Sequence, residues 1–198
     1  MRTDTFYTNR MSREEKEQRF RQHSKTIWMT GLSGAGKTTI ALGLEKELFE
    51  KGYFVKLLDG DDVRTGLNKD LTFSPEDRTE NIRRIAEVNR LFVLSGIITI
   101  NCFISPTHEI RSMAREIIGP DNFIEVFVKA PLEVCEKRDV KGLYAKARAG
   151  LIREFTGIDA PYEVPAHADL VIDTENSSVE SSIRRALDFI IPRIEYKF

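Results

Sequence analysis

Residues 31–38 form a run whose residue types and spacing suit the binding of phosphate. The run reads Gly-Leu-Ser-Gly-Ala-Gly-Lys-Thr and matches the pattern G-x-x-x-x-G-K-[ST] at every position. Glycines allow backbone N–H groups to turn inward around phosphate oxygens, and a helix that begins at the loop adds the positive end of its dipole. An apolar segment precedes the run and an amphipathic one follows it, which favours a phosphate loop over a glycine-rich turn with a surface lysine.

Two side chains of this run have expected roles in nucleotide chemistry. Lys37 is expected to reach the β- and γ-phosphates of a nucleoside triphosphate, and the Thr38 hydroxyl is expected to bind Mg²⁺. We therefore predict a nucleoside triphosphate and Mg²⁺ as cofactors. The residues predicted to bind the nucleotide are Gly31, Leu32, Ser33, Gly34, Ala35, Gly36, Lys37, Thr38 and Thr39. The motif alone does not distinguish a small-molecule kinase from a regulatory GTPase or a motor ATPase.

Acidic residues follow the second apolar segment of the chain. Asp59, Asp61 and Asp62 lie around Gly60, directly after this segment. A carboxylate at a strand end beside a phosphate loop can accept the proton of a substrate hydroxyl or order water around Mg²⁺. Asp61 or Asp62 can instead cap a short helix, and one aspartate can cap while another takes part in catalysis.

Hydrogen-bond donors gather in the loop and helix start that come next. Arg64, Arg78 and Asn81 lie there, and the planar fork of arginine suits phosphate or sulfate. For the arginines, a solvated helix face is the alternative. Phe73 is an apolar residue in a polar loop, so it is either a loop anchor or a platform on which a base stacks.

The elements that must position these residues alternate along the chain. Apolar runs predict strands at 26–30, 53–58, 97–104, 123–128 and 170–172. Amphipathic stretches predict helices at 38–51, 75–95, 106–118, 132–138 and 179–191. This alternation implies a parallel five-stranded sheet with helices on both faces, which is the three-layer α/β fold of P-loop NTPases. Ligands of such sheets bind at the carboxyl ends of the strands, where these motifs fall.

Capping signals mark several predicted helix ends. Gly52 and Gly96 are expected to end the helices 38–51 and 75–95. Pro106 is expected in the first position of the helix 106–118, where proline is favoured, which makes Ser105 a candidate N-cap. A capping box formed by residues 12 and 15 predicts a short exposed helix in a charged arm, residues 1–24.

Composition argues against several classes of function. The 198 residues include 30 Lys and Arg and 31 Asp and Glu, so the net charge of −1 indicates neither nucleic acid nor an acidic membrane surface as partner. We expect no membrane span and, because the N-terminus is polar and lacks a signal-peptide core, a cytoplasmic location. Cys102 and Cys135 are expected to be buried free thiols.

Over nearly the whole chain after the arm, the sequence resembles the adenylylsulfate kinase family. The resemblance rests on the blocks 31–38, 59–64, 66–84, 103–106, 138–144 and 155–163. Several such blocks in the right order are far more specific than a phosphate loop alone. Thr72 stands where the family usually has glycine, and Thr107 where it commonly has an aromatic residue. These departures affect local loop geometry and not the donors or carboxylates on which the prediction relies.

The resemblance implies that ATP phosphorylates the ribose 3′-hydroxyl of adenylyl sulfate, giving 3′-phosphoadenylyl sulfate and ADP. Transfer is expected to be in line, with catalysis mainly by positioning and charge neutralisation. Asp61 would act at the 3′-hydroxyl or, with Thr38, in the metal shell. The substrate-binding residues that the resemblance implies are Asp61, Arg64, Phe73, Arg78, Asn81, Ile104, Ser105, Lys141 and Phe155, with Lys37, Asp61 and Ser105 as the catalytic set.

Further roles follow from the same resemblance. Phe73 and Phe155 would hold the adenine of the acceptor between them, although core packing remains the alternative for Phe155. In the family, Ser105 is sometimes described as a phosphorylated intermediate; direct transfer needs no covalent serine, so capping or substrate contact is favoured. Arg138 would contact the ATP base.

The organisation implied is a P-loop kinase domain, residues 25–198, and a homodimer. A basic segment at about 139–157, which includes Lys141, would form a lid over the phosphates. Three alternatives stay open: a kinase for another small molecule, such as a sugar acid or nucleoside monophosphate, a regulatory P-loop switch, and a binding module without catalysis.

Overall fold

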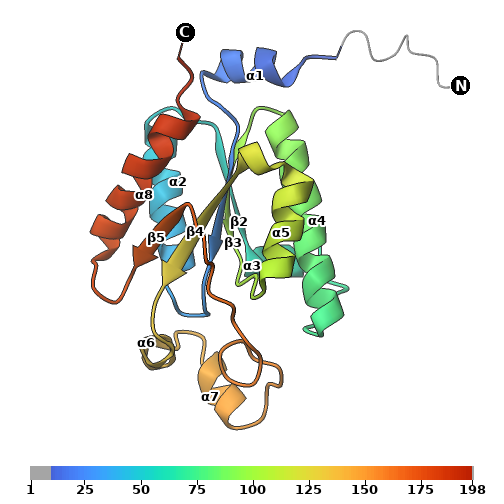
Figure 1. The fold of residues 1–198 in the computed structure, drawn as a ribbon, viewed down its shortest axis with the longest axis vertical. Helices are drawn as coiled ribbons and strands as arrows, with labels where there is room; N and C mark the ends of the chain where they lie inside the picture. The colour runs from blue at the N-terminus through green and yellow to red at the C-terminus, as the bar shows by residue number, and fades with distance from the viewer. Residues whose placement is uncertain (1–9, 198) are drawn as a thin grey trace, which may run out of the picture.

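The computed structural model describes residues 10–197 and confirms the predicted three-layer α/β fold. One parallel sheet has the strand order β2-β3-β1-β4-β5. Its strands are β1 (Thr26–Thr30), β2 (Val55–Asp59), β3 (Ile98–Cys102), β4 (Phe123–Lys129) and β5 (Leu170–Asp173). Because the pairings are all parallel, the five strands point toward the same end of the molecule, as the arrows of β4 and β5 show in Figure 1.

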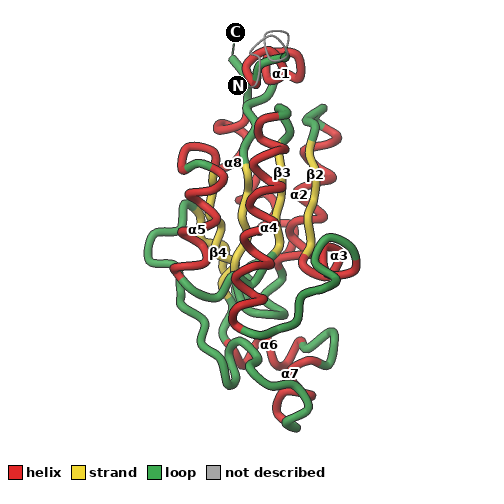
Figure 2. The backbone as a smooth tube through the Cα atoms, turned by 90° about the vertical axis from the view of Figure 1, so that its right-hand side faces the viewer, coloured by secondary structure: helices red, strands yellow, loops and turns green. Residues whose placement is uncertain are grey.

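Helices cover both faces of this sheet. They are α1 (Arg13–Phe20), α2 (Lys37–Glu50), α3 (Gly60–Thr65), α4 (Pro75–Leu94), α5 (His108–Ile118), the 3₁₀ turn η2 (Pro120–Asn122), α6 (Leu132–Arg138), α7 (Leu143–Arg148) and α8 (Val179–Ile194). α2 and α8 lie on one face, and α4 and α5 lie on the other (Figure 1). Figure 2 shows α3, α6 and α7 gathered at the end where the strands finish, with α1 at the opposite end.

The central strand shows how the two faces are filled. β1 is buried along its whole length, and successive side chains of a strand point to opposite faces. Ile27 and Met29 therefore pack in the cluster beneath α2 and α8, and Trp28 packs in the cluster beneath α4 and α5. In the second cluster the Trp28 ring lies 5.4 Å from the ring of Phe103 and 5.5 Å from that of Phe123.

A buried polar network holds α4 against β3. Asn89 and Asn101 exchange two side-chain hydrogen bonds of 2.8 Å, and both are fully buried. The Thr99 hydroxyl donates to Oδ1 of Asn89, and it lies within hydrogen-bond distance, 3.1 Å, of the hydroxyl of Thr26 in β1. A network in which the buried polar groups are hydrogen-bonded to one another fixes the position of α4 along the sheet. It therefore also fixes where the first turns of α4, which carry Arg78, lie relative to the strand ends.

The predicted glycine stops are close to the observed helix ends. α2 ends at Glu50 with Lys51 as its C-cap, so Gly52 is one residue beyond the cap, with φ +89°. The N–H groups of Gly52 and Tyr53 close the helix end on the carbonyls of Phe49 and Leu48. Gly96, with φ +78°, follows the C-cap of α4 in the same way.

The predicted start of the helix after β3 is wrong by two residues. Thr107, and not Ser105, is the N-cap of α5, and its hydroxyl accepts from the N–H of Ile110. Ser105 has φ +38°, whereas an N-cap residue has extended backbone angles. Pro106 accordingly lies outside the helix.

Three further differences concern short elements. α3 is capped by Asp59, whose Oδ1 accepts from the N–H of Asp61, so neither Asp61 nor Asp62 caps it. β3 is shorter than the predicted 97–104, and the lid segment contains α7, which was not predicted. Short helices of this kind carry too little periodic signal to be recognised from the sequence.

The capping box of α1 is confirmed, although one side chain of this helix is buried. Ser12 and Glu15 bond each other's backbone N–H groups. Glu17 is 6% exposed and accepts hydrogen bonds from Arg13 and Ser24. These contacts anchor α1 to the segment that leads into β1.

Other sequence predictions agree with the structure. Cys102 and Cys135 are buried free thiols. Within residues 10–197, none of the helices combines the length and the apolar character that crossing a membrane requires.

Candidate active site

The phosphate loop lies between β1 and α2. A Cβ atom on Gly31, whose φ is +152°, would lie 2.4 Å from the carbonyl oxygen of Val128 in β4, so this position needs glycine. Gly36 is the N-cap of α2, with φ +102°. Because α2 begins directly at the loop, its free N–H groups and its positive dipole end face the position predicted for phosphate.

Lys37 is held inside this loop by its own backbone. Its Nζ donates to the carbonyl oxygens of Gly31 at 2.9 Å and of Leu32 at 2.8 Å, and the residue is 9% exposed. Burial disfavours the charged amine and lowers the pKa of Lys37 to about 8. The lysine is therefore positioned in the loop before any phosphate contacts it.

The hydroxyl of Thr38 is hydrogen-bonded to Asp59, an acidic residue that is absent from the set of site residues predicted from the sequence. Thr38 Oγ1, in the first turn of α2, donates at 2.7 Å to Oδ2 of Asp59, which is the last residue of β2. Asp59 also caps α3, so both of its carboxylate oxygens are engaged. Asp59 ends a strand beside the phosphate loop, so its position in the sequence indicates a site residue as much as that of Asp61 does.

Asp61 itself faces the segment 139–157, which is predicted to form a lid. Its Oδ2 forms an ion pair with Nζ of Lys141, and both side chains are more than half exposed. The two residues lie on different sides of the site, one in α3 and one just before α7. The structure thus brings together two residues that are 80 positions apart and that the sequence had assigned to the substrate separately.

Arg64 and Arg78 flank the exposed ring of Phe73. The guanidinium carbon of Arg64 lies 4.3 Å from the ring centroid and that of Arg78 lies 5.9 Å from it. Arg64 donates to the carbonyl of Thr72, and Arg78 donates to the carbonyl of Phe73 at 2.8 Å. Burial lowers the pKa of each arginine, and their mutual repulsion also lowers that of Arg64. Phe73, at 61% exposure, lies open to solvent beside both cations.

Arg78 also joins this loop to the segment that follows the lid. Its two terminal nitrogens donate to Thr156 Oγ1 at 3.0 Å and to the carbonyl of Glu154 at 2.6 Å. Phe155, between these two residues, is 8% exposed and meets the ring of Tyr144 edge-on at 4.9 Å. The structure therefore places Phe155 in the core, which was the alternative to stacking, whereas Phe73 is exposed.

Asn81 lies one turn after Arg78 on α4 and is 6% exposed. Its Oδ1 accepts from Nδ2 of Asn68, a fully buried residue of the loop between α3 and α4, at 2.9 Å. Nothing in the sequence around Asn68 indicated this contact, because it depends on the path of the loop.

Ser105 and Ile104 occupy the bend after β3. Ser105 is 2% exposed, and its Oγ accepts from the indole nitrogen of Trp28 at 3.0 Å. The carbonyl of Ile104 accepts from Thr30 Oγ1 at 2.6 Å, and Thr30 also bonds the hydroxyl of Tyr162 at 3.0 Å. Side-chain hydrogen bonds from β1 therefore hold this bend, and β1 leads directly into the phosphate loop.

Arg138 and Thr174 meet at the other side of the phosphate loop. Arg138 donates to Oγ1 of Thr174 at 3.1 Å and to its carbonyl at 2.7 Å. Arg138 and Thr174 also donate to the carbonyl of Ala35, at 3.5 and 2.8 Å. Tyr144 of α7 donates to the carbonyl of Ser33 at 2.9 Å, so the loop is supported from the lid as well.

The oxygen atoms of Thr38 and Asp59 suit the binding of Mg²⁺ together with a nucleotide. The Thr38 hydroxyl and the Asp59 carboxylate offer the oxygen ligands that Mg²⁺ prefers, and Mg²⁺ is usually bound by one or two carboxylates together with phosphates. Among residues 10–197, no group of three or more His, Cys, Asp or Glu residues is arranged to hold a metal ion alone. Shared coordination with substrate phosphates therefore fits the residues present.

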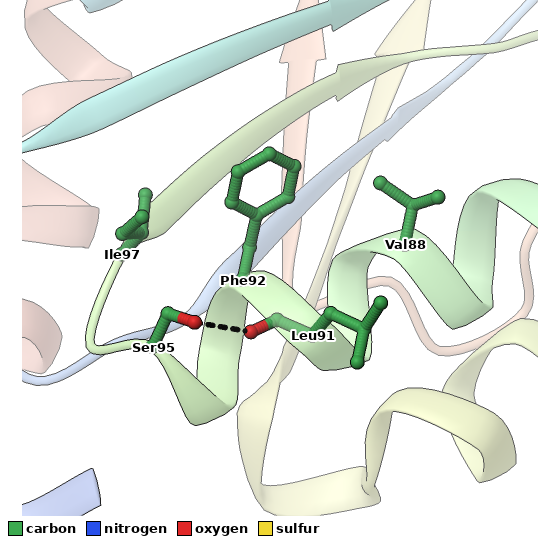
Figure 3. Close-up of a pocket in the computed structure, with 5 residues that line it drawn as sticks. All are labelled: Val88, Leu91, Phe92, Ser95 and Ile97. Carbon is green, nitrogen blue, oxygen red and sulfur yellow. Dashed lines mark hydrogen bonds between the residues drawn. The ribbon is translucent and has the colours of Figure 1, made fainter. Parts of the chain in front are cut away.

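A hollow elsewhere on the surface does not belong to this site. It is lined by Val88, Leu91, Phe92, Ser95 and Ile97 at the end of α4 and the start of β3. Figure 3 shows its mainly apolar side chains, with the Ser95 hydroxyl bonded to the carbonyl of Leu91. Because β3 starts here, the hollow lies at the opposite end of the sheet from the phosphate loop.

Comparisons with known proteins show which family the chain is similar to. The profile of a family described as Adenylylsulphate kinase matches residues 23–173. An adenylyl-sulfate kinase from Bacteroides thetaiotaomicron is 60% identical over 187 residues, which are 94% of this chain and 93% of that protein.

Two solved structures extend the comparison. The APS kinase CysC of Mycobacterium tuberculosis, in complex with AMPPNP and APS, is 46% identical with a TM-score of 0.81, covering 85% of this chain and 98% of that one. A hexameric APS kinase from Thiobacillus denitrificans is 29% identical with a TM-score of 0.65, covering 89% of this chain and 31% of that one.

Proposed function

Because the chain belongs to the adenylylsulfate kinase family, we propose that the site at its strand ends carries out the reaction of that family with the residue roles given below. The γ-phosphoryl group of ATP is transferred to the ribose 3′-hydroxyl of adenylyl sulfate. A bond forms between O3′ and the γ-phosphorus, the bond from that phosphorus to the β-phosphate oxygen breaks, and the hydroxyl proton passes to a base. The products are 3′-phosphoadenylyl sulfate and ADP.

The nucleotide is bound by the phosphate loop. Lys37, already inside the loop, moves from two neutral carbonyl oxygens to charged phosphate oxygens, which form stronger hydrogen bonds with an ammonium group. Arg138 and Thr174, bonded to each other beside Ala35, are positioned to border the nucleotide base. These contacts support ATP as the donor.

Thr38 and Asp59 are the residues that would hold Mg²⁺, with Asp61 near enough in sequence to reach its water shell. Mg²⁺ bound there would neutralise charge on the β- and γ-phosphates. Asp59 thus joins Thr38 and Asp61 as a residue proposed to contact the metal ion or its water shell.

Asp61 is proposed to accept the proton of the 3′-hydroxyl. It is exposed at the mouth of the site, and its ion pair with Lys141 directs the carboxylate toward the segment predicted to form a lid. A carboxylate that is ionised and within hydrogen-bond reach of the hydroxyl can act as a general base. Lys141 would then turn to the anionic oxygens of the substrate as Asp61 engages the hydroxyl.

Adenylyl sulfate is proposed to bind between the loop after α3 and the segment after the lid. Arg64, Arg78 and Asn81 supply the donors for the phosphosulfate. Phe73 supplies an exposed ring for the adenine, with Phe155 supporting the wall of the site from the core. Ile104 and Ser105 would border the acceptor from the bend after β3.

One observation carries the proposal most directly. The two guanidinium groups around Phe73 belong to a segment that the hydrogen bond between Asp59 and Thr38 joins to the phosphate loop. Donor and acceptor sites therefore meet at one end of the sheet, as phosphoryl transfer requires.

The test is a mass-spectrometric assay for 3′-phosphoadenylyl sulfate after incubation with ATP, Mg²⁺ and adenylyl sulfate. A panel with a sugar acid and a nucleoside monophosphate as acceptors distinguishes a kinase for another small molecule. A reaction without acceptor distinguishes a regulatory switch, which would hydrolyse nucleotide slowly and without acceptor dependence. Product from adenylyl sulfate alone is expected, and brisk turnover only with another acceptor would contradict the proposal.

Replacing Phe73 tests the acceptor site specifically. Phe73→Ala is expected to raise the KM for adenylyl sulfate about tenfold or more, because stacking on a base is worth about 1–3 kcal/mol. The KM for ATP should stay unchanged. Phe49→Ala removes a ring that is 71% exposed in α2 and is the matched control. An unchanged KM for adenylyl sulfate in the Phe73 variant would remove stacking from the proposal.

A homodimer in the cytoplasm is part of the same proposal. The Thiobacillus protein is hexameric, but its chain is much longer than this one. We therefore do not infer a hexamer for this chain. Light scattering of the purified protein would test the dimer.

A further inference from the structure

Asn68 is a fully buried polar residue to which the reaction assigns no role so far. Its backbone is fixed by hydrogen bonds from its N–H to the carbonyl of Val63, at 2.8 Å, and from the N–H of Leu71 to its carbonyl, at 3.1 Å. Its side-chain nitrogen donates twice to Asn81, to Oδ1 at 2.9 Å and to the backbone carbonyl at 3.4 Å. Its Oδ1 is buried and has no hydrogen-bond partner among residues 10–197.

These contacts determine which way the amide of Asn81 faces. The backbone carbonyl of Asn81 can only accept, so it keeps the NH₂ group of Asn68 turned toward α4. An NH₂ group at that position can only donate, so Oδ1 of Asn81 turns toward Asn68 and Nδ2 turns away. Nδ2 of Asn81 forms no hydrogen bond with any side chain or backbone group in the described part of the chain.

The unpaired oxygen of Asn68 supports a functional reason for this arrangement. A buried acceptor without a partner lowers stability, and each such group in a folded protein requires an explanation. Turning the Asn68 amide over would not help, because its oxygen would then face two carbonyl oxygens of Asn81. A smaller or apolar residue at position 68 would avoid the cost, but it would leave the amide of Asn81 free to rotate.

We infer that Asn68 is a positioning residue that locks the amide of Asn81 so that only N–H donors face the bound acceptor substrate. Asn81 lies three residues after Arg78 on α4, so both project from the same side of the helix. The inference rests on the proposed function, in which these two residues bind the phosphosulfate of adenylyl sulfate. Anionic oxygens are attracted by N–H groups, whereas a carbonyl oxygen of Asn81 in the same place would repel them.

The test compares Asn68→Asp and Asn68→Ala in steady-state kinetics. The aspartate keeps the shape of the side chain but can only accept when ionised, so it should turn the amide of Asn81 around and present an oxygen to the substrate. We expect the KM for adenylyl sulfate to rise about 30-fold in Asn68→Asp and about fivefold in Asn68→Ala. The kcat should stay within about threefold, and the KM for ATP should not change.

A double-mutant cycle with Asn81→Ala separates positioning from general loss of structure. If Asn68 acts through Asn81, adding Asn68→Ala to Asn81→Ala should raise the KM for adenylyl sulfate no further. An equal rise in both backgrounds would overturn the inference. If Asn68→Asp does not fold, as judged by circular dichroism, Asn68→Ala and the double mutant decide the question.

Asp70→Asn is the matched control in the same loop. It removes an exposed ion pair with Arg84 and leaves the contacts between Asn68 and Asn81 in place. We expect its KM for adenylyl sulfate to stay within about twofold of the wild-type value. If the wild-type chain turns over adenylyl sulfate but Asn68→Ala has an unchanged KM, this inference alone fails. If the wild-type chain does not turn over adenylyl sulfate, the proposed function fails, and this inference fails with it.

Discussion

At the scale of single residues, backbone carbonyl oxygens already orient three cationic side chains of the site, those of Lys37, Arg64 and Arg78. Lys37 bonds two loop carbonyls, and Arg64 and Arg78 bond carbonyls of the loop around Phe73. Exchange of these acceptors for phosphate or sulfate oxygens gives charge-assisted hydrogen bonds without first ordering a flexible side chain. Orientation of this kind is the main contribution a protein makes to phosphoryl transfer.

The first residue-scale prediction concerns Asp61. Asp61→Ala removes the proposed base and should lower kcat by about 100-fold or more, while the Kd for ATP stays within about threefold of wild type. Rapid-quench kinetics and nucleotide titration measure the two quantities. The neighbouring exposed residue Asp62, changed to Ala, is the control and should keep wild-type kcat. Equal turnover by the Asp61 and wild-type proteins would exclude Asp61 from catalysis.

The second prediction follows from the lowered pKa of Lys37. The free protein loses the charge of Lys37 as pH rises through about 8, whereas bound phosphate favours the charged form. ATP binding above pH 8 must therefore take up a proton, and its Kd should rise by up to about tenfold per pH unit. Calorimetric titration with a non-hydrolysable ATP analogue at pH 7 and pH 9, in two buffers, measures this uptake.

Lys37→Arg is the control for this experiment, because arginine stays charged throughout the range. Its binding should be weaker, since the loop is shaped around an ammonium group, but it should show no proton uptake. Absence of uptake by the wild-type protein at pH 9 would contradict the assignment of the titration to Lys37.

At the scale of elements, the lid is connected to the parts that it would cover. Tyr144 of α7 is buried, contacts the ring of Phe155 and donates to Ser33 in the phosphate loop. Arg78 of α4 bonds Glu154 and Thr156 on either side of Phe155. A shift of α7 would therefore change contacts both at the phosphate loop and, through Phe155 and Arg78, at the loop around Phe73. These contacts form a structural route that could couple the binding of the two substrates.

We predict that Tyr144→Phe weakens this coupling while keeping the packed ring. The change removes one hydrogen bond, worth about 0.5–1.5 kcal/mol, so the KM for ATP should rise about two- to tenfold. The melting temperature should move by only a few degrees. Tyr53→Phe, in the turn after α2, is the control. A wild-type KM for ATP in the Tyr144 variant would show that the lid and the loop are energetically independent.

At the scale of the whole molecule, the two ends of the sheet differ, because one carries the candidate active site and the other is stabilised by contacts of the N-terminal segment. The carboxyl end carries the site, and the opposite end is held together by α1 and the residues after it (Figure 1). Gln22 there donates to the carbonyls of Phe54 and Gly96 and accepts from the N–H of Phe54, so it links the starts of two strands. Glu17 bonds Ser24 just before β1.

Glu17 makes part of this stability depend on pH. Burial acts to raise its pKa, but hydrogen bonds from Ser24, Arg13 and His23 outweigh burial and lower it below the ordinary value of 4.5. A carboxyl group with a lowered pKa in the folded state stabilises the fold above the unfolded pKa and loses this contribution as pH falls through the folded value. Glu17→Gln should therefore reduce the unfolding free energy by about 1–3 kcal/mol at pH 7 and by less at pH 3.

Urea denaturation of wild type and Glu17→Gln at pH 7, 5 and 3 measures this difference. Glu14→Gln, on the exposed side of α1, is the control and should change the unfolding free energy by less than about 0.5 kcal/mol. A constant difference between the Glu17 variant and wild type at all three pH values would contradict the pH linkage.

The parallel sheet and the place of the phosphate loop between β1 and α2 could be predicted from sequence patterns alone. Lys37 and Thr38 lie in a continuous run of a strand, a glycine loop and a helix, and this succession leaves little choice of backbone geometry. The helix-ending glycines near 52 and 96 were likewise predictable, because a helix stop depends on local backbone angles.

The meetings of distant side chains could not be predicted from local sequence patterns. The bond between Thr38 and Asp59, the pairing of Asp61 with Lys141 and the lock between Asn68 and Asn81 depend on loop paths and strand register, which no local pattern encodes. The same holds for the left-handed turn that prevents residue 105 from capping α5 and for the burial of the ring at residue 155. These contacts join segments far apart in the chain, so they are fixed by packing and not by propensity.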